Sequence, residues 1–178
     1  AYWRNGDDER IVILTAFAQI ISLNARTGKP IPTFGTDGRI DAAQGLRRPV
    51  DRDYYTMSSP PVIVRNVIIA GSSVMDWWGH RPSPVGDVRG FDVVTGRLLW
   101  TFHTVAQGGE PGVETWEKDS WKETGNANVW APMSADEELG YVYLPVSTPT
   151  NDYYGGHRPG DGLFGESLVC LDVTTGKK

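Results

Sequence analysis

The sequence predicts an all-β protein whose short strands form part of a β-propeller. A turn phrase occurs three times, beginning at Asn24, Asp92 and Asp172, each followed by Thr-Gly three and four residues later. The 178 residues include 21 glycines and 12 prolines, and helical periodicity is weak throughout. These features favour many turns and short strands over long helices.

Each repeated phrase has the chemistry of a turn between two strands, with corners at residues 24–34, 92–102 and 172–178. The Asn or Asp side chain can accept hydrogen bonds from backbone N–H groups about two residues further on, and the glycine can adopt a positive φ. Strand-like runs precede the corners, and the longest covers residues 10–23. Trp100, inside the second repeat, is predicted to pack between sheets.

The repeats are 68 residues apart (Asn24 to Asp92) and 80 residues apart (Asp92 to Asp172). A four-stranded propeller blade needs about 40–50 residues, so each period predicts one blade plus a long insertion. Insertions of this kind gather on one face, where function is expected. The alternative is a β-sandwich whose hairpins share turn chemistry, and no Trp-Asp dipeptide supports the WD40 subtype.

Composition excludes several classes of function. Acidic and basic residues are interspersed and the net charge is −5, so a nucleic-acid partner is not predicted. Apolar runs are far shorter than a membrane helix needs, so a membrane span is not predicted either. The single Cys170 cannot form a disulfide framework or a zinc site, and the three histidines lack ligand spacing. Rossmann, Walker and G-x-S-x-G motifs are missing from the sequence.

The first candidate site is the segment 58–78, which reads as a hairpin of two apolar strands followed by small residues. Ala70, Gly71, Ser72 and Ser73 would let a ligand approach the backbone closely, and Asp76 follows them. A carboxylate at the end of a strand suits a hard cation such as calcium. The alternative is an ordinary turn at the serines, capped by Asp76.

The second candidate site is the segment 125–161. Trp130 stands just ahead of a turn and the strand-like run 141–146, where it can offer a flat face to a planar ring. The alternative is a tryptophan packed in the core or between blades. The nearby Trp116 and Trp121 stand among charged residues, which fits either the rim of a pocket or an ordinary surface loop.

Four blocks, occurring in one order along nearly the whole chain, resemble a known family. They are "SSPPVIV...AGSS", "GDVRGFDVVTGRLLWTFHTV", "NANVWAPMSADEELGYVYLPV" and "PTNDYYGGHRPGDGLFGESLVCLD". They resemble the quinoprotein dehydrogenases that use pyrroloquinoline quinone, and within them the membrane-type glucose dehydrogenase branch. The resemblance implies an eight-bladed propeller. We therefore expect residues 1–178 to be an internal fragment of one propeller domain, holding about three blades.

The resemblance also implies roles for individual residues. Ser58 and Ser73 match positions that contact the cofactor, and Trp130 matches the tryptophan on which the quinone stacks. Asp76 matches a metal-binding acid, for calcium or magnesium. Thr148 stands where the family has a metal-binding asparagine, so its hydroxyl or carbonyl, or the nearby residues 151 and 152, would have to replace that amide.

Other family features bear on substrate and catalysis. The family's general base follows the third corner and is expected beyond residue 178, so the catalytic residue is unknown and we expect the isolated chain to be inactive. A histidine of the glucose branch has no counterpart at the matching position near Trp3. The resemblance thus implies a sugar or alcohol substrate in general, rather than glucose.

The implied reaction moves a hydride from the substrate to the quinone while a cation acts as Lewis acid and the base removes the hydroxyl proton. Electrons would pass to ubiquinone or a cytochrome, in a periplasmic protein associated with the membrane through other segments. The alternative, from a different class, is a non-enzymatic propeller scaffold of the outer-membrane assembly type. Those scaffolds have shorter blades without long insertions.

Overall fold

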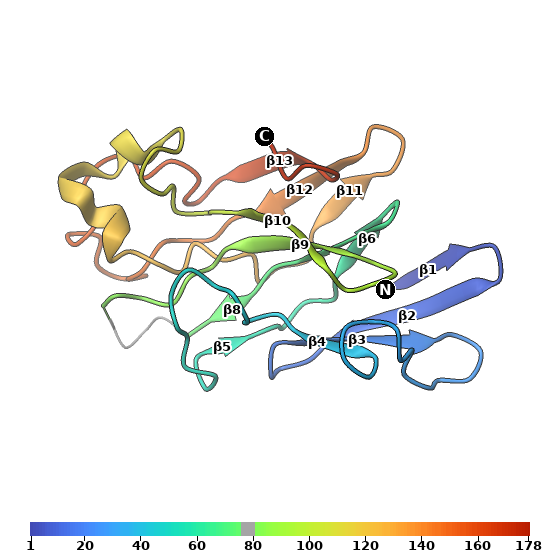
Figure 1. The fold of residues 1–178 in the computed structure, drawn as a ribbon. Helices are drawn as coiled ribbons and strands as arrows, with labels where there is room; N and C mark the ends of the chain where they lie inside the picture. The colour runs from blue at the N-terminus through green and yellow to red at the C-terminus, as the bar shows by residue number, and fades with distance from the viewer. Residues whose placement is uncertain (76–80) are drawn as a thin grey trace.

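The computed structural model describes residues 1–75 and 81–178, and nearly all of its regular elements are short β-strands (Figure 1). The strands are β1 (Tyr2–Asn5), β2 (Asp8–Leu14), β3 (Gln19–Asn24), β4 (Arg39–Asp41), β5 (Tyr55–Thr56), β6 (Val62–Val64), β7 (Val67–Ala70), β8 (Ser73–Val74), β9 (Val88–Asp92), β10 (Leu98–Phe102), β11 (Ser134–Asp136), β12 (Tyr141–Pro145) and β13 (Leu168–Asp172). Two short 3-10 helices, η1 (Val113–Thr115) and η2 (Glu117–Lys122), lie between β10 and β11. The predicted all-β fold is confirmed.

The strands form three antiparallel sheets that follow one another along the chain. The first has the order β1-β2-β3-β4, the second β10-β9-β7-β6, and the third β11-β12-β13. Figure 1 shows them stacked in chain order, with the third sheet uppermost. After β7 the chain leaves the second sheet, and β8 pairs with β5 in a small two-stranded sheet. The β5–β8 pair in the first period, and the segment 103–133 with its two 3-10 helices in the second, lie outside the three larger sheets, as the predicted insertions would.

Strand β7 is buried on both of its faces. Val67 and Ile69 belong to a core shared with the third sheet, whereas Ile68 and Ala70 belong to a core shared with the first sheet. Successive side chains of a strand point to opposite faces, so the continuous apolar run of β7 reflects a sheet covered on both sides. A two-layer sandwich buries one face of each sheet, whereas successive propeller blades bury both.

The three repeated phrases form the turn that their sequence predicts. The side-chain Oδ1 atoms of Asn24, Asp92 and Asp172 each accept bonds from the backbone N–H groups two and three residues ahead, at 2.7–3.1 Å. The N–H of the glycine four residues on donates to the backbone carbonyl of the same Asn or Asp at 2.8 Å. These glycines have φ between 68° and 77°, a conformation that costs other residues energy.

Two of the corners are covered by an aromatic ring from the preceding sheet. Trp100 donates its indole N–H to the Val173 carbonyl at 2.9 Å, and its ring leaves no space for a Cβ at Gly176. The predicted packing role of Trp100 is confirmed. At Gly96 the Phe34 ring lies 3.3 Å from where a Cβ would stand, and Ile40 lies closer, at 2.9 Å. The sheets are therefore joined through their turns as well as through their cores.

Some local expectations were wrong. The run at residues 10–23 is a hairpin of two strands, β2 and β3, because Thr15–Ala18 form a turn in which Ala18 has a φ of 55°. Trp116 belongs neither to a rim nor to a surface loop, since it is 2% exposed in the core between the second and third sheets. The charged residues around Trp116 concealed this burial.

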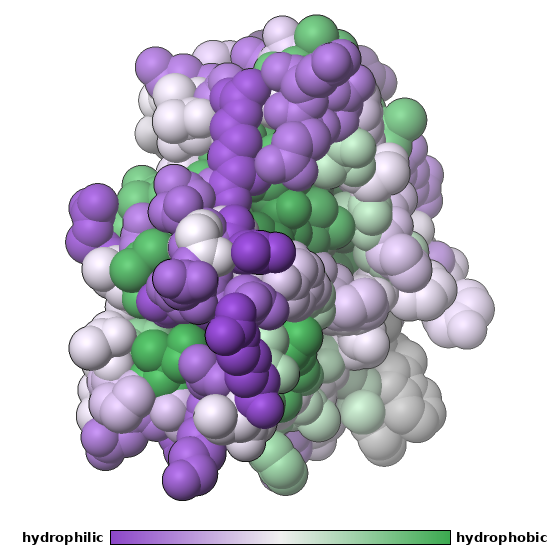
Figure 2. Space-filling model, turned by 90° about the vertical axis from the view of Figure 1, so that its right-hand side faces the viewer, coloured by the Kyte–Doolittle hydropathy of each residue, from purple (hydrophilic) through white to green (hydrophobic). Residues whose placement is uncertain are grey.

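The face of the molecule in Figure 2 is mainly hydrophilic, with hydrophobic groups in separate patches. The whole sequence has a net charge of −5. Among the residues that the structure describes, no helix has the length and apolar character to cross a bilayer.

Candidate functional site

A cavity of about 500 Å³ opens beside β8 and the end of β12. Its wall combines hydroxyl, amide and carboxylate groups with one large aromatic ring, and contains no basic side chain among the described residues. The lining residues are Ser73, Val74, Asn126, Asn128, Trp130, Val146, Ser147, Thr148, Asp152 and Glu166. The volume lies within the range of small-molecule sites.

Three of the predicted site residues meet in this cavity. Ser73 comes from β8, Trp130 from the irregular segment before β11, and Thr148 from the loop after β12. Trp130 lies outside the strands, ahead of β11, and is 56% exposed. An exposed ring at the wall of a cavity is available for stacking, so Trp130 is not a core tryptophan.

Ser58 contacts the backbone of Trp130 and is not one of the residues that line the cavity. Its hydroxyl donates to the Trp130 carbonyl at 3.4 Å, and the Ser59 hydroxyl donates to the same carbonyl. The role predicted for Ser58 as a cofactor contact stays a prediction. Asp76 lies outside the described residues.

Gly71 has a different role from the one its small size indicated. A Cβ atom at this position would lie 2.2 Å from the Val129 carbonyl oxygen. The glycine therefore makes room for the backbone of the segment that carries Trp130, rather than for a ligand. This close approach brings the second sheet and the Trp130 segment together at the cavity.

Asn128 joins three walls of the cavity, and the sequence alone did not single it out. Its Nδ2 donates to the Ser72 carbonyl at 2.7 Å, and its Oδ1 accepts from the Ser147 hydroxyl at 2.6 Å. Asn128 is 2% exposed; its bond to Ser72 is buried and its bond to Ser147 is partly buried. Its place two residues before Trp130 was the available signal.

Replacing Asn128 with alanine is expected to lower the free energy of unfolding by about 1–3 kcal/mol, because the Ser72 carbonyl and the Ser147 hydroxyl lose a buried partner. Denaturant titration of the full-length protein measures this loss. Asn5→Ala, at an exposed strand end, serves as the control and should stay within about 0.5 kcal/mol of wild type. Equal stability of Asn128→Ala and wild type would show that these two hydrogen bonds do not stabilise the fold.

The donor set of the cavity fits a hard divalent cation. The Thr148 hydroxyl donates its proton to Glu166 Oε1 at 2.9 Å, which leaves the lone pairs of its oxygen free to face a cation. Asp152 and Glu166 are the acids of the described wall. Calcium and magnesium prefer oxygen ligands. The described residues contain no cluster of three or more His, Cys, Asp or Glu side chains, so neutral oxygens would have to complete the site.

Comparison with known proteins identifies the family. The model of the glucose/ethanol/alcohol dehydrogenase β-propeller domain, PQQ, matches residues 1–178. The chain belongs to this family. The membership confirms the predicted resemblance to the pyrroloquinoline quinone dehydrogenases.

Individual relatives agree with this assignment. The chain is 33% identical to the quinoprotein glucose dehydrogenase of Escherichia coli K12, over 94% of this chain and 21% of that protein. It is 31% identical to the quinate/shikimate dehydrogenase (quinone) of Acinetobacter baylyi, over 95% of this chain and 20% of that protein. The chain thus spans about a fifth of the length of these relatives.

A solved structure supports the fold. The quinohemoprotein alcohol dehydrogenase of Comamonas testosteroni superposes with a TM-score of 0.75 at 22% identity, over 94% of this chain and 25% of that one. This similarity confirms the part-propeller architecture. The alternative of a β-sandwich is excluded by it and by the two-sided burial of β7.

Proposed function

We propose that this chain is the cofactor-binding segment of a dehydrogenase that oxidises a sugar or alcohol hydroxyl with pyrroloquinoline quinone. The observation that carries the proposal is the meeting of Ser73, Trp130 and Thr148 in one cavity of suitable volume. Resemblance had picked out these residues from separate parts of the chain. The relatives named above act on different hydroxyl compounds, so the substrate is proposed only as a class.

The residues of the chain would hold the quinone and a cation. The exposed face of Trp130 would support the planar ring, while Ser73 would face its polar edge. Thr148 would contribute an oxygen ligand to calcium or magnesium, together with Asp76. Bound in this way, the quinone would supply the two-electron acceptor and the cation a Lewis acid.

The charge of the wall makes the cation necessary in this proposal. Asp152 and Glu166 line the cavity without a basic residue among its described lining, and the quinone itself carries carboxylates. Like charges at short range repel, so quinone binding should depend on a cation between the two. We further propose ubiquinone or a cytochrome as electron acceptor, a periplasmic location, and a general base outside this chain.

Titration of the full-length apoprotein with pyrroloquinoline quinone tests the proposal. We expect saturable quenching of tryptophan fluorescence in the presence of calcium, strong weakening of quinone binding after chelation, and restored binding on adding calcium or magnesium. Dehydrogenase activity toward a panel of sugars and alcohols should follow the same cation dependence. A protein that shows no saturable quenching under any of these conditions would instead fit the non-enzymatic scaffold.

Asp76→Ala is expected to abolish calcium-dependent reconstitution with the quinone, because a carboxylate ligand of the cation would be lost. The same titration, run on the full-length variant with and without calcium, measures the effect. Asp37→Ala, in an exposed turn away from the cavity, is the control and should keep the dependence of wild type. Unchanged calcium dependence in Asp76→Ala would rule out a role for this carboxylate.

A further inference from the structure

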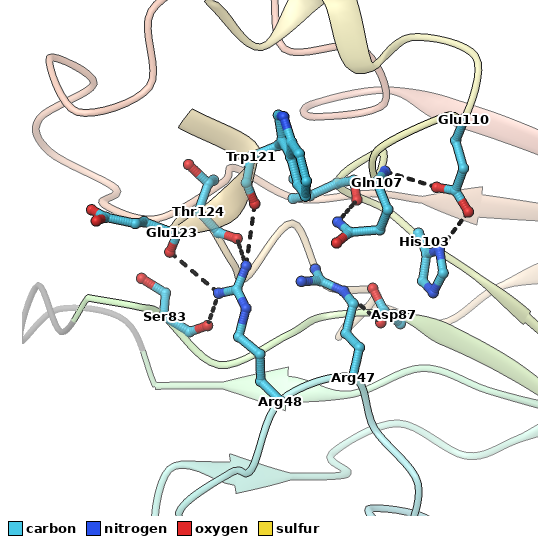
Figure 3. Close-up of polar contacts among 11 residues, drawn as sticks. Arg47, Arg48, Ser83, Asp87, His103, Gln107, Glu110, Trp121, Glu123 and Thr124 are labelled. Atoms are coloured by element: carbon cyan, nitrogen blue, oxygen red, sulfur yellow. Dashed lines mark hydrogen bonds and ion pairs between the residues drawn. The ribbon is translucent and has the colours of Figure 1, made fainter. Parts of the chain in front are cut away.

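Arg48 gathers four backbone carbonyl groups around one side chain. Its Nη1 donates to the carbonyls of Ser83 and Glu123 at 2.7 and 3.3 Å, and its Nη2 to those of Trp121 and Thr124 at 3.2 and 2.9 Å (Figure 3). Arg48 lies in the connection between β4 and β5, far along the chain from these partners. Three of the four carbonyls stand at the end of η2.

The contacts satisfy backbone carbonyl groups at the C-terminal end of η2. The last carbonyl groups of a helix have no partner inside it, and a cationic side chain can satisfy them. The cost of burying the guanidinium lowers the pKa of Arg48 to about 10, so it remains charged at neutral pH. The neighbouring Arg47 points to a different partner, the buried carboxylate of Asp87, at 3.2 Å (Figure 3). The hydrogen bonds described for the Arg48 guanidinium, by contrast, all go to backbone carbonyl groups.

The segment held by Arg48 continues directly into the cavity wall. After Thr124, the backbone N–H of Asn126 donates to the Pro84 carbonyl at 2.7 Å, and that of Ala127 to the Thr148 carbonyl at 3.2 Å. Asn126, Asn128 and Trp130 then line the cavity. Arg48 binds the carbonyls of both Ser83 and Thr124. It therefore holds the two chain segments that are joined by the hydrogen bond from Asn126 to Pro84.

We propose that Arg48 is a positioning residue that sets the quinone-binding wall through the segment from Thr124 to Trp130. The inference rests on the proposed function, since it assigns a residue to that same site. Only a planar guanidinium, with five N–H donors in a fixed fork, can serve four carbonyls spread over two segments. A lysine ammonium has three donors at one point and would hold only part of this set.

The test compares full-length Arg48→Met and Arg48→Lys with a matched control, Arg52→Met. Arg52 lies in the same connection but pairs with the exposed Asp41 at 2.6 Å. Quinone affinity is measured by fluorescence quenching at saturating calcium and well below the melting temperature of each variant, which is recorded separately. We expect the quinone Kd to rise about tenfold or more in Arg48→Met, less in Arg48→Lys, and not at all in Arg52→Met.

The outcomes separate positioning from stability. If Arg48→Met is less stable but binds the quinone with the wild-type Kd, Arg48 serves only the fold and the inference is wrong. Where Arg48→Met does not fold, Arg48→Lys decides: a Kd raised about threefold supports the inference, and a wild-type Kd overturns it. If the wild-type protein itself does not bind the quinone, the proposed function fails, which is a different result.

Discussion

Replacing Trp100 with alanine in the full-length protein is expected to lower the free energy of unfolding by about 3–5 kcal/mol. The ring is 8% exposed and fills the space between Gly90 of its own sheet and Gly176 of the next corner. Its indole N–H also satisfies the Val173 carbonyl. The substitution would therefore open a cavity and leave a buried acceptor without its partner.

Chemical or thermal unfolding measures this loss, and a second variant identifies its cause. Trp100→Phe retains much of the ring but lacks the N–H donor, so it should lose less stability than Trp100→Ala. A loss of less than about 1 kcal/mol in Trp100→Ala would contradict the view that this tryptophan joins neighbouring blades. Quinone affinity per folded molecule should stay near wild type, because Trp100 does not line the cavity.

The opposite pattern is expected for Trp130. Replacing Trp130 with alanine should cost little stability, since more than half of the side chain is exposed, but should weaken quinone binding by about 1–3 kcal/mol. That range is the one found for planar bases stacked on aromatic side chains, and it corresponds to roughly a fivefold to 150-fold rise in Kd. Trp130→Phe should recover part of the affinity, because phenylalanine keeps a flat face.

Isothermal calorimetry of the full-length apoprotein with the quinone and calcium provides the measurement. Phe17→Ala, an exposed aromatic residue in the turn between β2 and β3, is a control for loss of surface area alone. If Trp130→Ala binds the quinone as tightly as wild type, stacking on this ring is excluded. Comparing the two alanine variants then separates a tryptophan that stabilises the fold, Trp100, from one that binds the quinone, Trp130.

Local chemistry explains which predictions from the sequence succeeded. The corner turns depend on bonds between residues two to four positions apart, so the Asp or Asn and the glycine predict them without knowledge of the rest of the fold. The hairpin of two apolar strands predicted in the segment 58–78 is likewise present as β6 and β7. The division of residues 10–23 into two strands was missed because both strands share apolar alternation across the turn.

The site depends more on contacts between distant segments. Resemblance singled out Ser73, Trp130 and Thr148, which the structure brings together. It also singled out Ser58, which donates to the Trp130 carbonyl and whose cofactor contact stays a prediction. Glu166 carried no sequence signal, because its relation to Thr148 exists only once the loop after β12 folds back. The assignment of residues 1–178 to one domain stays a prediction.

By itself, the sequence determined the all-β class, the three repeated corners and the family of quinone-dependent dehydrogenases. The corners depend on hydrogen bonds between residues close together in the chain, and the family is identified by short stretches of consecutive residues. Only the tertiary structure decided that Trp116 is core, that Asn128 joins three walls and that Arg48 holds the segment leading to Trp130. These roles arise from burial and from bonds between residues far apart in the chain. Packing of the three sheets creates those contacts, and no local pattern encodes them.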